Sequence, residues 1–294
     1  MQTADLSINA ATKGALDREA GATGGDTLVC MDVLYGLHPV EQAIRSGRAL
    51  DHVSFARERH DARLEQLMEL CREAGVRIQA EPREQLTRMA RTDAHQGVVA
   101  FAKERKFLTI EDLLEQKTGV RRFFLAFDGV EDPHNLGALL RTADAAGVDG
   151  VILPERRSAP VTGTVAKTSA GASEYVRIAR VTNLVRALEQ MKRENVWCIG
   201  LDERGSQDYD QFDFAGTDCV LVLGSEGTGL HDLTKKTCDY LLRIPMAGSV
   251  PSLNVSVAGA VVMYEAARQR RHAQGTEKTP QPAASSKPQK GLGS

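Results

Sequence analysis

The sequence predicts an α/β protein with two domains, a small one followed by a larger one built on a parallel sheet. Between about Leu34 and Lys103, short strand-like runs alternate with amphipathic helical stretches. From Phe123 onward the strand-like runs are longer and almost wholly apolar, which is typical of parallel strands covered by helices on both faces. The chain has 294 residues, 42% of them hydrophobic and 26% charged, which is enough to bury cores of this size.

Residues 1–33 lack sustained periodicity and contain the stretch GATGGD, so they predict a flexible leader. They are polar where a secretory signal carries an apolar block. No apolar run in the chain reaches the roughly 18 residues that a membrane-spanning helix needs. We therefore expect a cytoplasmic protein that does not associate with a membrane.

The first predicted domain spans residues 34–103 and contains the strand-like runs HVSFA, VRIQA and GVVAF. Within 61–75, apolar residues recur at helical spacing and predict an amphipathic helix. Pro39 and Pro82 each stand where a helix could begin, because proline is tolerated at the first helical position. Residues 104–122 carry many charges without a long core pattern and predict a linker that contains a short helix.

The second predicted domain spans residues 123–271, and its strand-like runs are FFLAF, GVIL, VWCIG, CVLVLG and YLLRI. Open parallel sheets bind ligands beyond the carboxyl ends of their strands, so candidate site residues are sought directly after these runs. Residues 272–294 predict a flexible basic tail, and a run of basic residues begins at Arg268. A solvated terminus is the preferred interpretation of this tail, and attraction to RNA phosphates is the alternative.

Charge and cysteine content exclude several classes of protein. The net charge of −2 gives no general indication of a nucleic-acid partner. The five cysteines are odd in number, widely spaced and never arranged as CxxC, so the sequence suggests neither a disulfide framework nor a zinc site. We expect reduced, mostly buried thiols and no bound metal.

The first segment that could carry reactive or binding side chains is 128–147, which follows a predicted strand. Asn135 can cap a helix there, and Gly137 and Arg141 are four residues apart, hence on one helix face. The guanidinium would then lie over a position that has no side chain. The alternative is a weak surface pair between Arg141 and Asp144.

The second segment, 223–230, carries glycines at Gly224, Gly227 and Gly229. This order is not the GxGxxG of a dinucleotide-binding turn, which disfavours a nicotinamide-dependent dehydrogenase. Gly224 could let the ring of a ligand approach the backbone, with Glu226 beside it as a hydrogen-bond acceptor. A plain turn with a solvated glutamate is the alternative.

The third segment, 244–259, joins polar side chains to the start of an apolar helix. Pro251 restrains the loop, Ser252 and Asn254 offer hydroxyl and amide groups, and a Val/Ala-rich stretch follows them. Either polar residue could simply cap this helix, since serine and asparagine are common at that position.

Together and in this order, the three segments resemble motifs 1, 2 and 3 of the SpoU/TrmH family of RNA 2'-O-methyltransferases in the SPOUT superfamily. The stretches LYGLHPVEQAI (34–44) and HQGVVAF (95–101) also resemble the substrate-binding domain of its 23S rRNA guanosine-2'-O-methyltransferase subgroup. The resemblance covers about Leu34 to Arg271. The matching motif residues are Asn135, Gly137 and Arg141, then Gly224, Glu226 and Gly227, then Pro245, Ser252, Leu253 and Asn254.

The resemblance implies a C-terminal domain with a trefoil knot, a homodimer with each active site near the subunit interface, and S-adenosylmethionine bent inside the knot. It assigns the methyl donor to a set of cofactor-binding residues: Leu223, Gly224, Gly227, Ile244, Met246, Ser252 and Leu253. It assigns catalysis, without a metal, to a second set: Arg141, Asn135, Glu226, Ser252 and Asn254.

The implied function is methylation of a ribose 2'-hydroxyl in RNA, with a guanosine of 23S rRNA or its precursor as the preferred target. A guanidinium hardly ever loses its proton, so we expect Arg141 to clamp a phosphate and stabilise the forming alkoxide rather than act as a base. The alternatives are a tRNA-modifying or adenosine-modifying enzyme of the same family, or a non-catalytic RNA-binding or ribosome-assembly protein. His95 and His134 are candidates for RNA contact or for loop structure.

Overall fold

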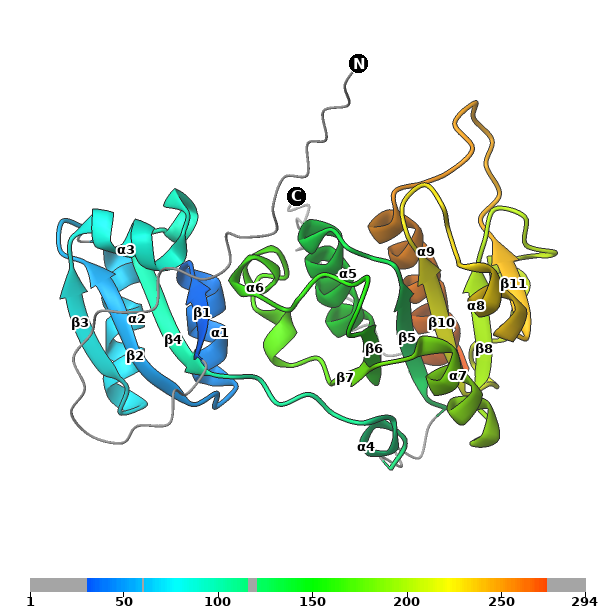
Figure 1. Cartoon of the computed structure of the whole chain (residues 1–294), viewed down its shortest axis with the longest axis horizontal. Coiled ribbons are helices and arrows are strands. Elements are labelled where there is room, and N and C mark those ends of the chain that lie inside the picture. The colour runs from blue at the N-terminus through cyan, green and yellow to red at the C-terminus, as the bar shows by residue number, and fades with distance from the viewer. Residues whose placement is uncertain (1–30, 60, 116–120, 274–294) are drawn as a thin grey trace, which may run out of the picture. The chain divides into compact units, whose positions relative to one another are not determined.

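A computed structural model describes residues 31–59, 61–115 and 121–273 of the chain (Figure 1). The predicted leader, apart from its last three residues 31–33, and the tail beyond residue 273 lie outside the described residues. The first strand begins at Met31, ahead of the predicted domain start at Leu34. The last helix ends at Ala273, inside the segment predicted as tail.

The N-terminal domain is a four-stranded sheet in the order β1-β4-β2-β3, in which only β2 and β3 run parallel. Apolar residues of α1 and α2 cover one face of this sheet, and α3 covers the other. The prediction of a small α/β domain is therefore confirmed. The strands are β1 (Met31–Tyr35), β2 (Leu50–Ala56), β3 (Arg77–Glu81) and β4 (Val98–Lys103), and the helices are α1 (Leu37–Arg45), α2 (Ala62–Glu73) and α3 (Arg83–Ala90).

Neither proline that was expected to open a helix occupies the first helical position. Helix α1 begins at Leu37, so Pro39 is its third residue, and Pro82 is the residue that precedes α3. Both positions lie in or before the first turn, where a backbone N–H has no partner within the helix. Proline is tolerated throughout this turn, so the prediction located the helices correctly but missed their first residue by one or two positions.

The second domain is built on a seven-stranded sheet in the order β7-β6-β5-β10-β8-β11-β9, and all its strand pairs are parallel. This confirms the predicted parallel sheet. The sequence did not reveal β7, which contains Arg180, or the two-residue β9, because both are too short and polar for a core-strand pattern. The strands are β5 (Phe123–Asp128), β6 (Gly150–Pro154), β7 (Ile178–Val181), β8 (Trp197–Leu201), β9 (Gln207–Asp208), β10 (Cys219–Gly224) and β11 (Tyr240–Arg243).

Helices cover both faces of this sheet, as near-continuous apolar strands require. On β5, Phe123, Leu125 and Phe127 join the core formed with α5 and α9, whereas Phe124 and Ala126 join the core formed with α4 and α7. Successive side chains of one strand thus supply two separate cores. The helices of this part of the chain are α4 (Ile110–Leu114), α5 (Pro133–Ala146), α6 (Gly163–Thr168), α7 (Leu184–Arg193), α8 (Asp232–Thr237) and α9 (Val255–Ala273).

Two arginines at the start of the predicted basic run belong to α9 and serve the fold. Arg270 donates from Nε to the carbonyl of Phe214 at 3.1 Å and lies over the ring of Phe123 at 5.2 Å. Arg268 pairs with Glu265 at 2.7 Å. Arg270 thus ties the last helix to the sheet and Arg268 pairs within the helix, so neither guanidinium belongs to the predicted tail.

The four described cysteines are free thiols, in agreement with the prediction. Cys71, Cys198 and Cys219 are buried and Cys238 is partly buried. Burial raises the pKa of Cys71 to about 11 and the pKa values of Cys219 and Cys238 to about 12. Such thiols remain protonated at neutral pH and are poor nucleophiles.

Candidate active site

The three candidate segments follow the carboxyl ends of strands β5, β10 and β11 in the second sheet. Strands β5 and β10 lie side by side, with Asp128 opposite Gly224 at their carboxyl ends. The third segment follows β11, which is separated from β10 by β8. It leads into α9, and α9 packs in the same core as α5. Parallel pairing therefore brings three distant stretches of the sequence to one edge of the sheet.

Asn254 connects all three segments through its side-chain amide. Its Nδ2 donates to Oδ1 of Asn135 at 3.1 Å and also to Oε1 of Glu226. Its Oδ1 accepts from the backbone N–H of Ser256 at 2.9 Å, at the start of α9. Asn254 thus acts as a helix cap and as the link between the segments, so the two interpretations of this residue are compatible.

Helix α5 begins differently from the prediction. Its cap is Asp132, whose carboxylate accepts from the N–H groups of His134 at 3.1 Å and Asn135 at 3.2 Å. Asn135 is the third residue of the helix rather than its cap, and it is only 8% exposed. Because aspartate already satisfies the free N–H groups, the side chain of Asn135 is available to Asn254.

Gly137 has a different role from the one the spacing suggested. A Cβ atom at this position would lie 1.8 Å from Oγ1 of Thr168, at the end of α6. The missing side chain therefore lets α6 pack closely on α5, and it leaves no hollow for a guanidinium. The expectation that Arg141 lies over an open position at Gly137 is wrong.

Arg141 lies on the exposed side of α5. Among the described residues it forms no ion pair with Asp144, so the surface-pair alternative is wrong as well. It does not line either of the two cavities described below. The structure brings Asn135, Glu226 and Asn254 together and leaves Arg141 as a solvated cation on the same helix as Asn135.

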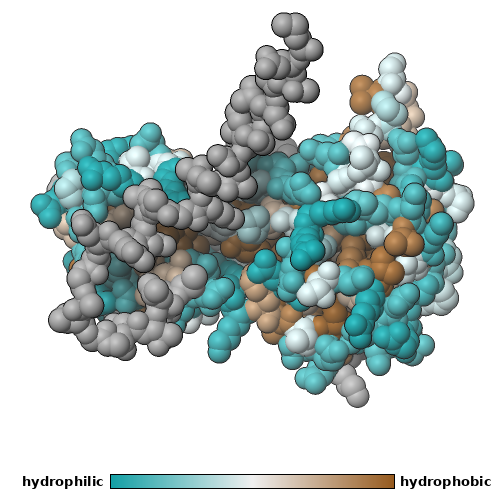
Figure 2. All heavy atoms as spheres, in the orientation of Figure 1, coloured by the Kyte–Doolittle hydropathy of each residue, from teal (hydrophilic) through white to brown (hydrophobic). Residues whose placement is uncertain are grey.

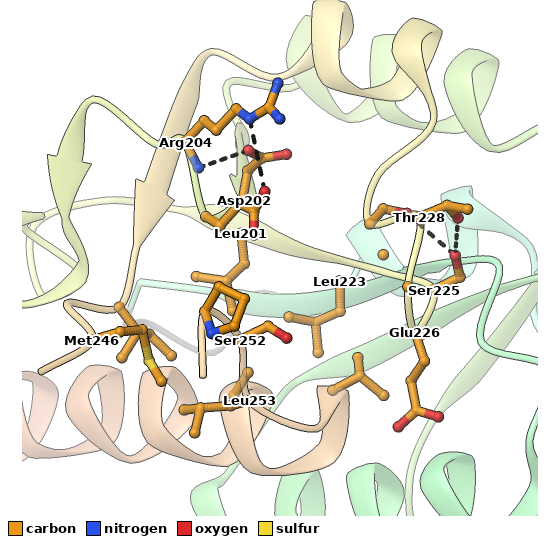
Figure 3. A pocket seen from close by; sticks show the side chains of 18 of the residues that line it. Leu201, Asp202, Arg204, Leu223, Ser225, Glu226, Thr228, Met246, Ser252 and Leu253 are labelled. Atoms are coloured by element: carbon orange, nitrogen blue, oxygen red, sulfur yellow. Dashed lines mark hydrogen bonds and ion pairs between the residues drawn. The ribbon is translucent and has the colours of Figure 1, made fainter. Parts of the chain in front are cut away.

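A first cavity of about 400 Å³, the Leu223 cavity, opens beyond β10 (Figure 3). Figure 3 shows Leu223, Met246 and Leu253 on one side of it and Ser225, Glu226 and Thr228 on another. All seven residues that the resemblance assigns to the methyl donor line this cavity: Leu223, Gly224, Gly227, Ile244, Met246, Ser252 and Leu253.

A tight turn forms one wall of the Leu223 cavity. Ser225 and Gly229 exchange backbone hydrogen bonds of 3.0 and 3.1 Å, and Gly227 and Gly229 have positive φ angles of 89° and 67°. A Cβ atom on Gly224 would lie 2.1 Å from the backbone of Gly229. The space above Gly224 is therefore filled by the turn itself, which corrects the expectation that it admits the ring of a ligand.

The far end of the Leu223 cavity is charged. Asp202 pairs with Lys235 at 2.6 Å and accepts from the backbone N–H of Arg204 at 2.9 Å. Burial by itself raises the pKa of Asp202, but Lys235 and Arg204 together outweigh it and leave that pKa below its usual value. The cavity thus combines an apolar wall with an ionised pair, and its volume lies within the usual range for small-molecule sites, about 300–1000 Å³.

A second cavity of about 430 Å³, the His231 cavity, adjoins the first. The two share Ser225, Glu226, Thr228 and Val255, so the turn after β10 separates them. Unlike the first cavity, the second is lined mainly by charged and polar residues. Those that belong to it alone are Gly129, Val130, Glu131, Asp132, Asn135, Arg157 and His231.

Sequence reasoning missed three side chains at the His231 cavity. The buried carboxylate of Asp128 accepts from the backbone N–H of His231 at 2.8 Å, and its other oxygen lies 2.9 Å from Nδ1 of the imidazole. Nε2 of His231 lies 3.3 Å from Nη1 of Arg157. Asp128 is the first residue of the first segment and His231 directly follows the second, and these positions were the only signal in the sequence. His95, considered for RNA contact, is completely buried and cannot make it.

Comparison with known proteins identifies the family and the fold. Residues 122–264 match the SpoU rRNA Methylase family, and residues 33–108 match the RNA 2'-O ribose methyltransferase substrate binding domain. The 23S rRNA (guanosine-2'-O-)-methyltransferase RlmB of Ralstonia nicotianae is 45% identical, over 81% of this chain and 96% of that protein. The chain belongs to the SpoU rRNA methylase family. RlmB of Pseudomonas aeruginosa is 43% identical over the same shares of the two chains.

Solved SpoU family structures have the same fold. The SpoU methyltransferase AviRb from Streptomyces viridochromogenes, in complex with AdoMet, has a TM-score of 0.70 at 26% identity, over 82% of this chain and 90% of that one. The AdoMet-bound rRNA methyltransferase from Sinorhizobium meliloti has a TM-score of 0.69 at 27% identity, over 81% and 87%. Within the described part of this chain, no group of three or more His, Cys, Asp or Glu residues could hold a metal ion.

Proposed function

We propose that this protein transfers a methyl group from AdoMet (S-adenosylmethionine) to the ribose 2'-oxygen of a guanosine in 23S rRNA. One observation carries the proposal: Asn254 joins Asn135 and Glu226 beside the turn that separates a cavity with an apolar wall from a second, mainly polar cavity. A transfer between two substrates needs such an arrangement, because each must be held apart from the other except at the reacting atoms. The names of the RlmB relatives support the choice of RNA and nucleoside.

The Leu223 cavity fits the methyl donor. Met246 and Leu253 are each 38% exposed beside this cavity, which leaves apolar surface for a bound adenine ring to cover. The ionised pair of Asp202 and Lys235 offers an acceptor and a donor to the polar groups of the same molecule. When bound, AdoMet supplies a sulfonium-activated methyl group, and the remaining chemistry is a matter of positioning the acceptor oxygen.

The residues around Asn254 would position that oxygen. Hydrogen bonds hold both polar atoms of the Asn254 amide. Its Nδ2 donates to Asn135 and Glu226, and its Oδ1 accepts from the backbone of Ser256, so the amide has one orientation. Ser252 lines the donor side and carries an exposed hydroxyl for hydrogen bonding. Arg141 would clamp a phosphate of the incoming RNA and stabilise the forming alkoxide, while the hydroxyl proton leaves to phosphate or water. The exposed position of Arg141 suits contact with RNA.

We also propose the homodimer and the trefoil knot that the resemblance implies. Val257 and Tyr264 lie one heptad apart on α9 and are each 49% exposed, and Val250 is 67% exposed in the preceding segment. In Figure 2 the segment that protrudes between β11 and α9 is mostly pale, with a few brown groups near its tip. Exposed apolar surface of this kind is typical of a subunit interface. The hydrogen bonds from Asn254 to two earlier segments support a looped path of the chain here.

The N-terminal domain is proposed to bind the RNA, in keeping with its match to the substrate-binding family model. Within the described ranges, no helix has the length and apolarity to cross a bilayer. We propose a cytoplasmic location, because ribosomal RNA is the proposed substrate.

Mass-spectrometric mapping of ribose methylation tests the function. We expect one 23S rRNA guanosine to lose its 2'-O-methyl group in cells that lack this protein and to regain it when the gene is restored. Loss of a methyl group from tRNA or from an adenosine would select the alternatives within the family. Identical methylation patterns in both kinds of cell would overturn the proposal.

A further inference from the structure

We propose that Arg157 and His231 form a clamp for a backbone phosphate next to the target nucleotide, with Asp128 holding the imidazole in place. This inference rests on the proposed function, because it concerns how the RNA lies in the His231 cavity. It assigns a binding role to three side chains outside the sets of donor-binding and catalytic residues.

The clamp is assembled from three strand ends. Asp128 ends β5, Arg157 lies in the segment after β6, and His231 precedes α8. The side chain of Asp128 is 11% exposed and that of His231 is 42% exposed. The buried carboxylate thus holds an imidazole whose other edge is accessible from the cavity. A buried carboxylate behind a histidine fixes the orientation of the ring.

The hydrogen bonds define which nitrogen faces the ligand. The N–H group at Nδ1 of His231 donates a hydrogen bond to the carboxylate of Asp128. The other ring nitrogen, Nε2, therefore faces the guanidinium of Arg157 at 3.3 Å. In this arrangement Arg157 donates to the imidazole. A phosphate oxygen is a stronger acceptor for a guanidinium than an imidazole nitrogen is. When a phosphate arrives, the guanidinium can turn to it, and His231 can take up a proton at Nε2 and donate to the same phosphate.

The surroundings place this phosphate at the rim of the cavity. The charged groups facing His231 are Asp128 on β5, Arg157 after β6 and Glu226 after β10, with Glu131 and Asp132 before α5 and Asp232 next in sequence. The carboxylates repel a phosphate from the interior of the cavity. Asp132 is engaged with the N–H groups of α5, and Asp128 with His231, so Arg157 and His231 remain to bind an anion.

Gly129, whose φ is 93°, lies beside the imidazole. A Cβ atom at this position would lie 3.4 Å from Cε1 of His231 and 3.1 Å from Cβ of Ser225. The ring therefore packs closely over the backbone that follows β5. This packing, together with two contacts to one carboxylate, restricts His231 to a single orientation before any ligand is bound.

RNA binding measured without a methyl donor tests the clamp. The probe is a labelled in vitro transcript of 23S rRNA, titrated with wild-type protein and with Arg157→Ala, His231→Gln and Arg156→Ala. Arg156 is the matched control, since it is an adjacent exposed arginine that does not line the cavity. We expect Kd to rise about tenfold for Arg157→Ala and to change less than about twofold for Arg156→Ala. The slope of log Kd against the logarithm of the salt concentration should fall by about one for Arg157→Ala and stay unchanged for Arg156→Ala.

A pH series gives the second readout. An imidazole that donates to both Asp128 and a phosphate carries a proton on each nitrogen, so binding through His231 takes up a proton and the affinity of the wild type should fall as pH rises. His231→Gln should have no such dependence, because its side chain can donate a hydrogen bond but does not titrate. If this variant instead alters the pH dependence of kcat and leaves RNA affinity unchanged, the phosphate clamp is wrong and His231 acts as a proton acceptor.

Two controls separate failure of the clamp from failure of the proposed function. Calorimetry with AdoMet should give normal donor affinity for Arg157→Ala and His231→Gln, which establishes that the variants are folded. If wild-type protein methylates the transcript while Arg157→Ala and Arg156→Ala bind RNA equally well, only the clamp is overturned. If the wild type binds AdoMet and RNA but transfers no methyl group, the proposed function fails independently of the clamp.

Discussion

The Leu223 cavity and the His231 cavity share one wall but are built by different means. The first is shaped by a glycine turn and apolar side chains, and its lining comes mostly from two sequence segments. The second is lined by charged and polar side chains that follow several separate strands. A small ligand of fixed shape needs a rigid, close-fitting backbone, whereas a polyanion needs charges at its entrance. Donor and acceptor sites should therefore respond independently to substitution, except at the shared wall of Ser225, Glu226, Thr228 and Val255 and at Asn254, which bonds to it.

The largest expected effect lies on the acceptor side. Replacing Arg141 with alanine should lower kcat about a thousandfold, because a stabilising charge on the forming alkoxide is lost. Donor affinity should stay within about twofold of the wild type, since Arg141 does not line the Leu223 cavity. Single-turnover kinetics and calorimetry with AdoMet measure the two quantities. Near-normal turnover of Arg141→Ala on 23S rRNA contradicts the role assigned to this residue.

The second-largest effect is expected on donor affinity at the Leu223 cavity. Gly224→Ala places a Cβ atom 2.1 Å from the backbone of Gly229, so the turn must move. We expect donor affinity to fall about a hundredfold and the melting temperature to drop, as overpacking at a backbone contact predicts. Gly248→Ala is the matched control, because a Cβ atom there has nothing within 4 Å. Equal donor affinity in the two variants would refute the importance of the turn.

Asn254→Ala should affect both sides, because Asn254 is the link between them. Loss of its bonds to Asn135 and Glu226 should reduce kcat/KM about a hundredfold and donor affinity about fivefold. Asn254→Asp is the matched control, because it keeps an oxygen that can accept from the N–H of Ser256 and cap α9 but removes the Nδ2 donor to Asn135 and Glu226. If Asn254→Asp keeps near-normal activity while Asn254→Ala loses it, capping of α9 explains the effect and the linking role does not.

The smallest effect concerns acid stability at the charged end of the Leu223 cavity. The pKa of Asp202 in the folded protein lies below its ordinary value, about 3.9. Its ionised form therefore stabilises the fold above that pH, and this contribution is lost as pH falls through the lowered pKa. Melting temperatures of the wild type and Asp202→Asn should differ by a few degrees at pH 6, and the difference should shrink as pH falls below about 4. A difference that stays constant as pH falls below about 4 contradicts this assignment.

The sequence predicted the parallel sheet because its signal is local, whereas the residues assigned to the donor, which line the Leu223 cavity, were named through the family resemblance. Apolar strand runs identify the sheet, and the residues assigned to the donor fall inside two contiguous motifs. The role of Gly224 was misjudged because the turn folds the backbone of Gly229 against it. Residue types alone do not reveal this contact. Asn135 was misjudged because Asp132, three residues earlier, is an equally good cap.

The His231 cavity could not be predicted in the same way. Asp128, Arg157 and His231 are separated by dozens of residues, and only the order of strands in the sheet brings their side chains together. A single histidine after a glycine turn has many possible roles, and an aspartate at a strand end is common. The contact between them depends on the pairing of β5 with β10, which neither local sequence encodes by itself.

The central claim is that the junction at Asn254 aligns a ribose oxygen with the methyl group of the donor. The most direct test incubates purified protein with a 23S rRNA transcript and AdoMet that carries a deuterated methyl group, then analyses the nucleosides by mass spectrometry. The account predicts deuterated 2'-O-methylguanosine as the product, and none with Arg141→Ala. Label on a nucleobase, or no label although donor and RNA both bind, would contradict it.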